Sequence, residues 1–459
     1  MLDFCASVRN LVGILLLASM PIASFSKAAD ISTDDATDWL RQYIRFDSST
    51  PEGTLAAGAF LRDLLHREGI PTRWIVSPSG QPFLYARSGQ AESTSRALLL
   101  LHHIDVVPAG DGWSQAPFAA DVVGEDLFGR GSIDDKSLGI AHLVSFLRFH
   151  RRAQEPRREV VFLAVSGEED GGMDGLGWLL ESHPELFEGV EAVLTEGGNN
   201  RVYGDQLAWW GLEVTQKRPL WLKATASGRP GHGSSLNLHS APHRLIRGLS
   251  YLVERPRNYR LTDEARDFLE AAAPMESPAF QAVVSNLDQI LTDPEPEKHL
   301  LPAMPNYLLD TVQVNGLAAG DRVNVTPGEA TAWIDVRLLP DTDQATFLES
   351  LRTEVGDDVL LEVLLSSPVV PPSPTDRPLY RCLEGALQPQ APVIPVFITA
   401  ITDARFIRAR GIAAYGFSPF ILGAKELRGI HGSNEHIPLE VFAQGLETMW
   451  TLVWECAGS

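Results

Sequence analysis

Residues 97–108 read "ALLLLHHIDVVP", an apolar run that ends in two histidines and an aspartate. An unbroken apolar run of this length is typical of a strand that is buried on both faces. Histidine and aspartate are uncommon at the end of such a strand, because burying a polar group without a partner costs free energy. The stretch therefore predicts a covered sheet, and it raises the question of what these polar side chains do at the edge of that sheet.

Apolar runs of the same kind recur at 159–165 ("EVVFLAV") and 191–195 ("EAVLT"). Between the first two runs, residues 136–150 ("KSLGIAHLVSFLRFH") have the apolar spacing of an amphipathic helix. Doubly buried strands that alternate with helices predict an α/β fold with a mostly parallel sheet covered on both sides. The pattern resumes near the C-terminus, with a strand at 393–398 and a helix at 438–454.

The middle of the chain has a different pattern. Half-exposed strands and two amphipathic helices follow the order β-α-β-β-α-β, which predicts a smaller α+β domain of ferredoxin-like type. We interpret the polar, proline-rich residues 255–304 as an excursion within this insert. A chain of 459 residues is long enough for two domains. The predicted division is a signal peptide at 1–28, a first domain in two parts at 29–215 and 368–459, and the insert at 216–367.

The N-terminal segment predicts export. Arg9 precedes an apolar stretch at 11–25, and "SKA" at 26–28 has the form of a cleavage site for a signal peptidase. The alternative is an uncleaved anchor, but the stretch is shorter than the roughly 20 residues that span a bilayer. We expect cleavage near Ala28 and a periplasmic or secreted protein, with no membrane span after processing.

Composition excludes some functions. A hydrophobic content of 44% and a charged content of 21% are those of a soluble globular protein. The formal net charge of −21 argues against a nucleic-acid partner, because no basic surface is available to displace counterions. Of the three cysteines, Cys5 lies in the predicted signal peptide. Cys382 and Cys456 could form a disulfide in an oxidising compartment, but we favour free buried thiols. Any bound metal must therefore be held by histidine, aspartate and glutamate.

Acids and histidines follow several of the predicted strands. In an open α/β sheet, ligands bind at the carboxyl ends of the strands. Like charges ~4 Å apart repel by about 4 kcal/mol at an effective dielectric constant near 20, so clustered carboxylates require a counter-charge such as a pair of divalent cations. A mixed set of imidazoles and carboxylates suits zinc best, with cobalt or manganese also suitable. Each residue alone is weak evidence, and the prediction depends on the whole set: His102, His103, Asp105, Asp134, Asp135, Glu168, Glu169, Asp170, Glu196 and His431.

Nine motifs in a fixed order carry a resemblance to a known family. They are "HHIDVVP", "GRGSIDDKS", "SGEEDGG", "TEGG", "GRPGHGSS", "NVTP", "DVRLLP", "TDARFI" and "IHGSNE". The chain resembles metallopeptidase family M20, the dinuclear zinc hydrolases that include aminoacylase, carboxypeptidase G, carboxypeptidase S and succinyl-diaminopimelate desuccinylase. The resemblance covers nearly everything after the predicted signal peptide. It implies a zinc-hydrolase catalytic domain, with the insert serving as a lid and dimerisation domain.

The resemblance also implies a set of metal ligands. His103 and Glu196 would bind one zinc ion, Glu169 and His431 would bind the other, and Asp134 would bridge both. A cis peptide bond is expected after Asp134 on the same basis.

Catalysis would depend on Glu168, which precedes a ligand and would act as general base and then as general acid. Asp105 lies in phase with His103 on the strand, and its carboxylate could accept a hydrogen bond from the far nitrogen of that imidazole. His102 is out of phase and should pack on the opposite face of the sheet.

Three further residues match the family's motifs for substrate recognition. His232 would stabilise the oxyanion, often in the active site of a partner subunit. Asn324 would contact the substrate, and Arg405 would bind its α-carboxylate. The alternatives are a helix-start residue for His232, a turn residue for Asn324 and a surface ion pair for Arg405. We interpret His436 as a surface residue.

The predicted function is hydrolysis of an amide bond in a dipeptide, a peptide C-terminus or an N-acyl amino acid, with two divalent metal ions, preferably zinc, as cofactors. The alternative is a catalytically silent module that binds metal or peptide. A serine hydrolase is excluded by the lack of a G-x-S-x-G motif, and no P-loop or dinucleotide fingerprint occurs. The expected partners are a small substrate and a second copy of the chain, bound through the insert.

Overall fold

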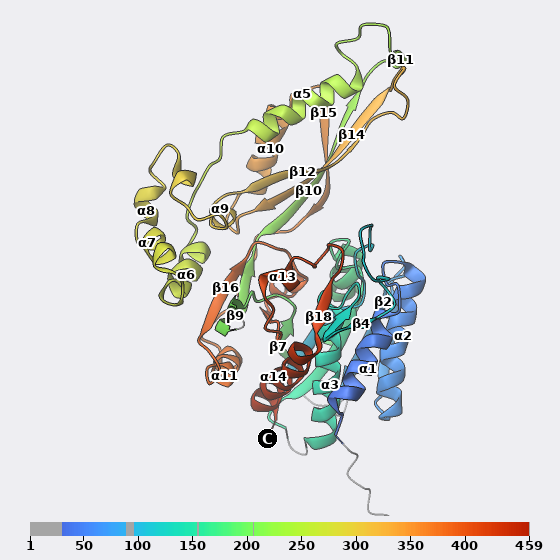
Figure 1. The fold of residues 1–459 in the computed structure, drawn as a ribbon, viewed down its shortest axis with the longest axis vertical. Coiled ribbons are helices and arrows are strands. Elements are labelled where there is room, and N and C mark those ends of the chain that lie inside the picture. Colours follow the sequence, from blue (N-terminus) through green and yellow to red (C-terminus); the bar gives the residue numbers. More distant parts are fainter. Residues whose placement is uncertain (1–29, 89–95, 154–155, 205, 459) are drawn as a thin grey trace, which may run out of the picture. The chain divides into compact units, whose positions relative to one another are not determined.

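A computed structural model describes residues 30–88, 96–153, 156–204 and 206–458 of the chain. The predicted signal peptide, residues 1–28, lies outside the described residues. Figure 1 shows the large sheet with its helices and, joined to it, the insert with a sheet of its own. The predicted α/β class with a mostly parallel sheet is confirmed by the way the strands pair.

The large sheet has nine strands, and its central strands β6, β3, β7 and β17 run parallel. The strands at the β1 edge are antiparallel. The order across the sheet is β1 (Thr72–Val76), β2 (Pro82–Arg87), β6 (Glu159–Val165), β3 (Ala97–His103), β7 (Val190–Thr195), β17 (Ala413–Gly416), β9 (Gln206–Gln216) and β16 (Val393–Ile398), with β8 (Arg201–Tyr203) paired to β9.

Helices cover both faces of this sheet, as the unbroken apolar runs predict. Leu98 and Leu100 of β3 point into one hydrophobic cluster, and Leu99 and Leu101 point into another. Each fully buried leucine stabilises the fold by about 1.5–3 kcal/mol. The first face is covered by α1 (Thr33–Ile44), α2 (Pro51–Arg67), α3 (Lys136–Arg152), α11 (Pro378–Leu387) and α14 (Leu439–Ala457), and the second by η1 (Met173–Gly177), α4 (Trp178–Ser182), η2 (Pro184–Phe187) and α12 (Ala404–Ala409).

The helix α3 begins directly after Asp134 and Asp135, and its first residue anchors that turn. Lys136 is fully buried, and its Nζ donates hydrogen bonds to the carbonyl oxygens of Tyr43 and Phe46. The backbone N–H of Lys136 also donates to the carbonyl oxygen of Gly131. A buried ammonium group is stable only with such partners, so Lys136 connects the start of α3 to the end of α1.

The insert contains a four-stranded antiparallel sheet with the helices α5 (Ala241–Glu254) and α10 (Gln344–Val355) packed on one face. The chain order β-α-β-β-α-β is the predicted one. The separation of residues 216–367 as a domain of its own stays a prediction. The order across the sheet is β12 (Thr311–Ala318), β14 (Glu329–Leu338), β10 (Arg218–Ser227) and β15 (Val359–Ser366).

Residues 255–304 lie within the insert in the chain, but they pack against the large sheet and not against the sheet of the insert. Their helices rest on β16 at the edge of the large sheet, where Phe268 packs with Phe397 and Ile398. The physical reason is that β16 is an edge strand with an apolar face, which the excursion covers. The elements of this segment are α6 (Asp263–Ala272), η3 (Ala273–Met275), α7 (Pro278–Ser285), α8 (Leu287–Ile290) and η4 (Pro296–Lys298), followed by α9 (Pro305–Leu308).

Shorter elements complete the described fold. A three-stranded ladder joins β4 (Val122–Val123), β5 (Asp126–Phe128) and β18 (His436–Pro438), and a two-stranded ladder joins β11 (Gly231–His232) and β13 (Val325–Thr326). The short helix α13 (Ala424–Leu427) precedes the loop that carries His431. Within the described ranges, the helices are all too short or too polar to cross a bilayer.

Cys382 and Cys456 form a disulfide, so the expectation of free thiols is wrong. The two cysteines lie on α11 and α14, and their Cα atoms are 5.6 Å apart. These helices pack against each other on the same face of the large sheet. The sequence does not reveal this neighbourhood, because 74 residues separate the two positions.

Reducing this disulfide should lower the free energy of unfolding by about 2–5 kcal/mol, because the bond restricts a long loop in the unfolded chain. Urea unfolding with and without dithiothreitol would measure the loss. The double variant Cys382→Ala/Cys456→Ala should show the same loss and no further response to reductant. An unchanged urea midpoint on reduction would contradict the pairing.

Candidate metal centre

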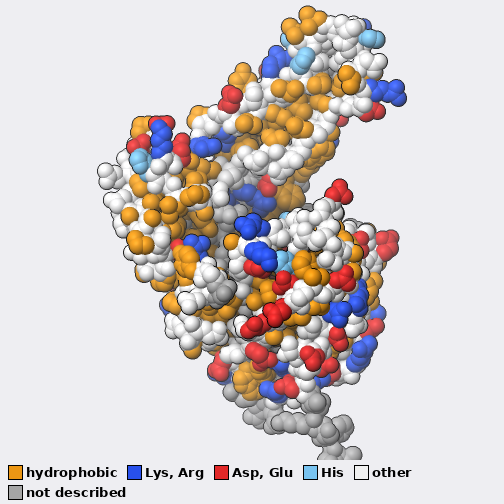
Figure 2. Space-filling model, in the orientation of Figure 1, with side chains coloured by type: hydrophobic (Ala, Val, Ile, Leu, Met, Phe, Trp, Pro, Cys, Tyr) orange, Lys and Arg blue, Asp and Glu red, His pale blue; other side chains and the backbone are white. Residues whose placement is uncertain are grey.

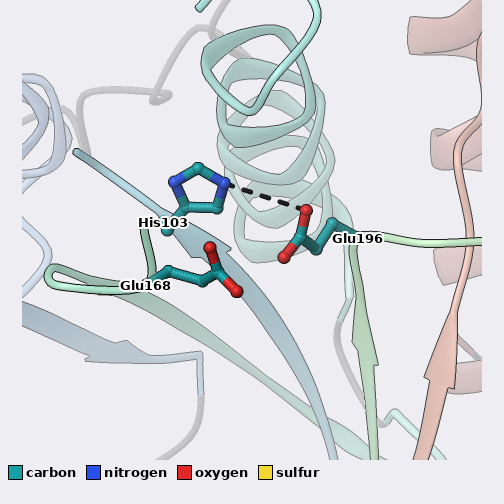
Figure 3. A group of neighbouring side chains, drawn as sticks. All are labelled: His103, Glu168 and Glu196. Atoms are coloured by element: carbon teal, nitrogen blue, oxygen red, sulfur yellow. Dashed lines mark ion pairs between the residues drawn. The ribbon is translucent and has the colours of Figure 1, made fainter. Parts of the chain in front are cut away.

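The carboxyl ends of three neighbouring strands bring acids and an imidazole to one edge of the large sheet. His103 is the last residue of β3, Glu168 and Glu169 follow β6, and Glu196 follows β7 directly. Figure 3 shows the side chains of His103, Glu168 and Glu196 pointing toward one another. The sheet order β6-β3-β7 places these three strands side by side, which is why residues far apart in sequence meet here.

Two loops complete the cluster. Asp134 lies in the turn before α3, and His431 lies in the loop before β18. The peptide bond between Asp134 and Asp135 is cis, as the resemblance implies. The structure therefore brings together all five residues predicted as metal ligands.

The distances divide the cluster into two halves that share Asp134. The Nε2 atom of His103 lies 3.0 Å from Oδ1 of Asp134 and 3.8 Å from Oε2 of Glu196. The Nε2 atom of His431 lies 3.2 Å from Oδ2 of Asp134 and 3.2 Å from Oε2 of Glu169. Each imidazole thus faces one oxygen of the Asp134 carboxylate and a second acid, which is the arrangement of two adjacent cation sites with a shared carboxylate.

The orientation of His103 is fixed from the other side of its ring. Its Nδ1 donates to the backbone carbonyl oxygen of Asp105 at 2.9 Å, whereas the Asp105 carboxylate oxygen Oδ1 is 3.9 Å away. The expected hydrogen bond therefore goes to the backbone of Asp105 and not to its side chain. The other carboxylate oxygen, Oδ2, accepts a hydrogen bond from the backbone N–H of Glu169 at 3.1 Å. Asp105 thus positions residues from both halves of the cluster.

The protonation states of these groups show a deficit of positive charge. Burial raises the pKa values of Glu168 and Glu196 well above the usual value for glutamate. Burial lowers the pKa of His103, but the hydrogen bond to Asp134 and the nearby acids outweigh it, so the pKa of His103 is raised well above its usual value. Hydrogen bonds to Asp134 and Glu169 raise the pKa of His431 to about 10. The cluster therefore favours bound positive charge, whether protons or cations.

The donor set fits divalent cations. Three carboxylates and two imidazoles surround two adjacent positions, and zinc, cobalt and manganese accept this mixture of oxygen and nitrogen ligands. Among the described residues, two groups have ligand atoms close enough to hold an ion: His103 with Glu168 and Glu196, and His103 with Asp134 and Glu169. Glu168 is thus near enough to contact a bound ion or a water molecule beside it.

A cavity of about 560 Å³ opens beside the cluster. Asp134, Glu169, Glu196 and His431 are in its wall together with Glu168. Much of the remaining wall is apolar and comes from the end of β16 and from the segment before His431: Ile398, Ile401, Phe420, Leu422, Leu427 and Ile430.

The insert contributes Trp221 and Arg337 to the wall of this cavity. Alternation along β14 explains Arg337, because Ile334 and Val336 point into the core of the insert and Arg337 therefore points to the other face. The guanidinium of Arg337 is held by Asp335, with Nε to Oδ1 at 2.7 Å and NH2 to Oδ2 at 2.9 Å. We did not select Arg337 from the sequence, although it lies in the quoted motif "DVRLLP" and the strand period places it away from the core.

Arg405 lies outside this wall. It is only 3% exposed, and its NH1 and NH2 groups donate to the carbonyl oxygens of Thr402 and Gly171, both at 2.6 Å. It is not a surface ion pair, and its predicted contact with the substrate's α-carboxylate stays a prediction. Its physical role is to join the loop after β6 to the start of α12.

His232 and Asn324 lie together, but not at the metal cluster. His232 is exposed on β11, and the carbonyl oxygen of Asn324 accepts a hydrogen bond from the backbone N–H of Gly233 at 2.8 Å. Neither side chain is in the wall of the cavity described above. Their predicted roles in the reaction stay predictions.

His102 and His436, the two remaining histidines interpreted from the sequence, are both buried. His102 faces α1 and α3, where its Nε2 lies 3.4 Å from the Tyr43 hydroxyl, as strand alternation predicts. His436 is only 6% exposed and stacks on Phe128, so its interpretation as a surface residue is wrong. The strand β18 pairs with β5 and buries this ring, which the short sequence "NEHIP" does not reveal.

A sequence model of peptidase family M20/M25/M40 matches residues 99–455. The chain belongs to this family. The match covers the strand that carries His103, the insert and the loop that carries His431, so the resemblance inferred from the motifs is confirmed.

Relatives with known names are similar over most of the chain. Aminoacylase-1B of Rattus norvegicus is 26% identical over 424 residues, which cover 90% of this chain and 93% of that protein. The N-fatty-acyl-amino acid synthase/hydrolase PM20D1 of Xenopus tropicalis is 28% identical over 355 residues, covering 74% of this chain and 69% of that protein. These similarities support a hydrolytic enzyme that cleaves amide bonds, and they do not favour a catalytically silent module.

Solved structures share the fold. The M20 family metallo-carboxypeptidase Sso-CP2 of Sulfolobus solfataricus superposes with a TM-score of 0.71 at 18% identity, covering 92% of this chain and 99% of that chain. Human carnosine dipeptidase 1 superposes with a TM-score of 0.70 at 17% identity, covering 92% and 97%. At this level of identity the likeness concerns the fold alone.

Metal binding should release protons. In the metal-free chain His431 is protonated at pH 7, because its pKa is raised to about 10, and an imidazole must lose that proton to bind a metal. The affinity for zinc should therefore rise with pH between 6 and 8, with release of at least about one proton per chain. Calorimetric titration of zinc in buffers with different ionisation enthalpies measures this number.

The variant His431→Gln provides the control and should release about one proton fewer. An affinity for zinc that stays constant between pH 6 and 8 would contradict the protonation state described for the cluster.

Proposed function

We propose that this protein hydrolyses the amide bond of N-acyl amino acids with two divalent metal ions, preferably zinc, bound by His103, Asp134, Glu169, Glu196 and His431. The observation that carries the proposal is a single cavity whose wall contains the acids of the cluster, an arginine and an apolar surface. An N-acyl amino acid has one chemical group for each: an amide for the metal cluster, a carboxylate for the arginine and an apolar chain for the apolar wall.

Bound divalent cations supply Lewis acidity, and they lower the pKa of water from about 15.7 to about 7. The protein's own contribution to proton transfer is Glu168. Its side chain is 9% exposed, in the wall of the cavity beside Glu196 and His103. Burial raises its pKa well above the usual value, so the carboxylate holds a proton firmly once it has accepted one from water. It then passes this proton to the nitrogen of the leaving amine.

Arg337 is the proposed site for the substrate's carboxylate. Its guanidinium is oriented by two hydrogen bonds to Asp335 and lies in the cavity wall. A guanidinium can bind a carboxylate with two parallel hydrogen bonds, which fixes the substrate's orientation as well as its position. A carboxylate anchored there leaves the acyl chain to contact the apolar part of the wall.

Dipeptides are the second candidate substrates. They share the carboxylate, but they also have a free amine that requires an acid or a carbonyl group. The apolar residues Phe420, Leu422 and Ile430 in the wall favour an acyl chain over such a charged group.

A homodimer through the insert is proposed as the functional state. Figure 2 shows apolar side chains on the surface of the insert, and Ile246, Tyr251 and Val253 of α5 are 62–72% exposed. A second copy would cover this surface. The exposed residues His232 and Asn324 would then be available to a partner subunit's site, as the family resemblance implies.

Export to the periplasm or the medium is proposed as well. The disulfide between Cys382 and Cys456 supports it, because disulfides persist in oxidising compartments.

The test is an assay of the purified mature protein against a panel of N-acyl amino acids and dipeptides, with and without a chelator. We expect hydrolysis of N-acyl amino acids with apolar acyl groups, loss of activity on chelation and recovery with zinc. Activity that persists in the metal-free protein, or hydrolysis of dipeptides alone, would refute the proposal.

Glu168→Gln should retain metal and lose turnover, with kcat falling by about 10²–10⁴-fold, because the amide cannot accept the proton from water. Steady-state kinetics and metal analysis of the same preparation measure both properties. Glu169→Gln is the matched control at the next position, and it should lose metal affinity together with activity. A kcat within about threefold of wild type in Glu168→Gln would exclude the role of Glu168, since loss of a general base has a larger effect.

Arg337→Met should raise KM for N-acyl amino acids by about 10–100-fold, because a charge-assisted hydrogen bond contributes about 1.5–3 kcal/mol. The same substitution should have little effect on analogues whose carboxylate is converted to an amide. Arg337→Lys keeps the charge but lacks the paired donors, so its KM should lie between the values of wild type and Arg337→Met. An equal rise in KM for the N-acyl amino acid and for its amide analogue would show that Arg337 does not bind the carboxylate.

A further inference from the structure

A buried ion pair connects the two loops that complete the metal cluster. Arg130 lies four residues before Asp134, and Glu435 lies four residues after His431. The NH1 group of Arg130 donates to Oε2 of Glu435 at 2.6 Å, and the two side chains are 1% and 0% exposed. Neither residue was selected from the sequence, and neither is in the wall of the cavity.

The Glu435 carboxylate organises the backbone of the Asp134 turn. Its Oε1 accepts hydrogen bonds from the backbone N–H groups of Ile133 at 2.7 Å and Asp134 at 3.1 Å. Its Oε2 accepts a further one from the N–H of Gly131 at 3.1 Å. Together with Arg130 these bonds use the four acceptor positions of a carboxylate, so the side chain determines the path of the turn up to the shared ligand.

Arg130 also binds the backbone of the loop that carries His431. Its NH2 group donates to the carbonyl oxygen of Gly432 at 2.8 Å, next to His431 in the chain. The guanidinium also lies over the ring of Trp113, 5.3 Å from its centroid. The backbone of His431 has φ 58°, a left-handed conformation that is uncommon for residues other than glycine and requires support from its surroundings. Arg130 supplies that support through the adjacent peptide.

Stability alone does not explain this pair. Replacing a buried ion pair with apolar residues of similar volume is often neutral or stabilising. Here, however, both partners direct their remaining hydrogen bonds to the backbone next to a ligand, Asp134 on one side and His431 on the other. The ligand atoms of these two residues, Oδ2 and Nε2, are 3.2 Å apart. The ion pair of Arg130 and Glu435 therefore links the loop of Asp134, the shared ligand, to the loop of His431.

We propose that Arg130 and Glu435 are positioning residues that hold Asp134 and His431 at the separation that the metal ions require. The inference rests on the proposed metal centre and adds to it a function for two residues that touch neither metal nor substrate. Without the pair, the two loops would move independently, and each metal ion would have to order them on binding. The expected consequence is a weaker affinity for metal in a chain that still folds.

The test measures binding of zinc alone to the full-length, chelator-treated protein by calorimetry, without substrate. Glu435→Gln removes the negative charge and places an amide N–H group near Arg130 or the backbone donors. We expect its dissociation constant for zinc to rise by about 10–100-fold, as is usual when the partner of a metal ligand is removed. Arg130→Lys keeps the charge but cannot reach both Glu435 and Gly432, and it should show a smaller rise.

The matched control is Glu159→Gln. Glu159 also forms an ion pair, with the partly buried Arg87, but it lies at the start of β6, whereas the predicted metal ligands follow the end of that strand. Its loss should lower the free energy of unfolding and leave the affinity for zinc within about threefold of wild type, since it orients no ligand.

Zinc affinities within threefold of wild type in folded Glu435→Gln and Arg130→Lys would overturn the proposal, as would an equal loss in Glu159→Gln. Should Glu435→Gln fail to fold, Arg130→Lys decides alone. Failure of both to fold without zinc would make the pair a requirement of folding and would also overturn the inference. A wild-type protein that binds zinc but cleaves no N-acyl amino acid would refute the proposed substrate and leave this inference standing.

Discussion

The mutual repulsion of carboxylates at one edge of a sheet is the constraint on which the rest of this structure depends. Asp134, Glu169 and Glu196 meet there with Glu168 beside them, and neither histidine can neutralise them all. Burial raises the pKa values of Glu168 and Glu196, and the neighbouring acids raise those of His103 and His431, so the cluster holds protons in place of separated charges. Divalent cations resolve the same conflict more effectively, because each brings two positive charges and accepts the lone pairs that the protons otherwise occupy.

The fold supports this cluster with rigid elements and with directed hydrogen bonds. The strands β6, β3 and β7 carry predicted ligands at their carboxyl ends, and the core is packed on both faces of these strands. The two predicted ligands that come from loops are secured differently, through Lys136 at the start of α3 and through Arg130 and Glu435. Burying a charged side chain is costly, and here each buried charge is used to fix the backbone beside a ligand. Rigidity at the site therefore comes from polar groups as much as from the hydrophobic core.

Sequence reasoning succeeded where one local pattern determines the outcome. The alternation of β3 separates His102, which faces Tyr43, from His103, which faces the cluster. It failed where contacts between distant segments decide. His436 looks exposed in "NEHIP", yet pairing of β18 with β5 covers it. Cys382 and Cys456 are joined because α11 and α14 pack side by side.

The sequence by itself determined the α/β class, the family and the set of acids and histidines that gather at the sheet edge. Apolar periodicity and the order of motifs are local properties of the chain, and they survive without any knowledge of the fold. Only the tertiary structure decided which arginine faces the cavity, that the two cysteines pair, and that Glu435 reaches across to the Asp134 turn. These facts depend on distances between segments that lie up to 305 residues apart, and such distances arise only when the elements pack together.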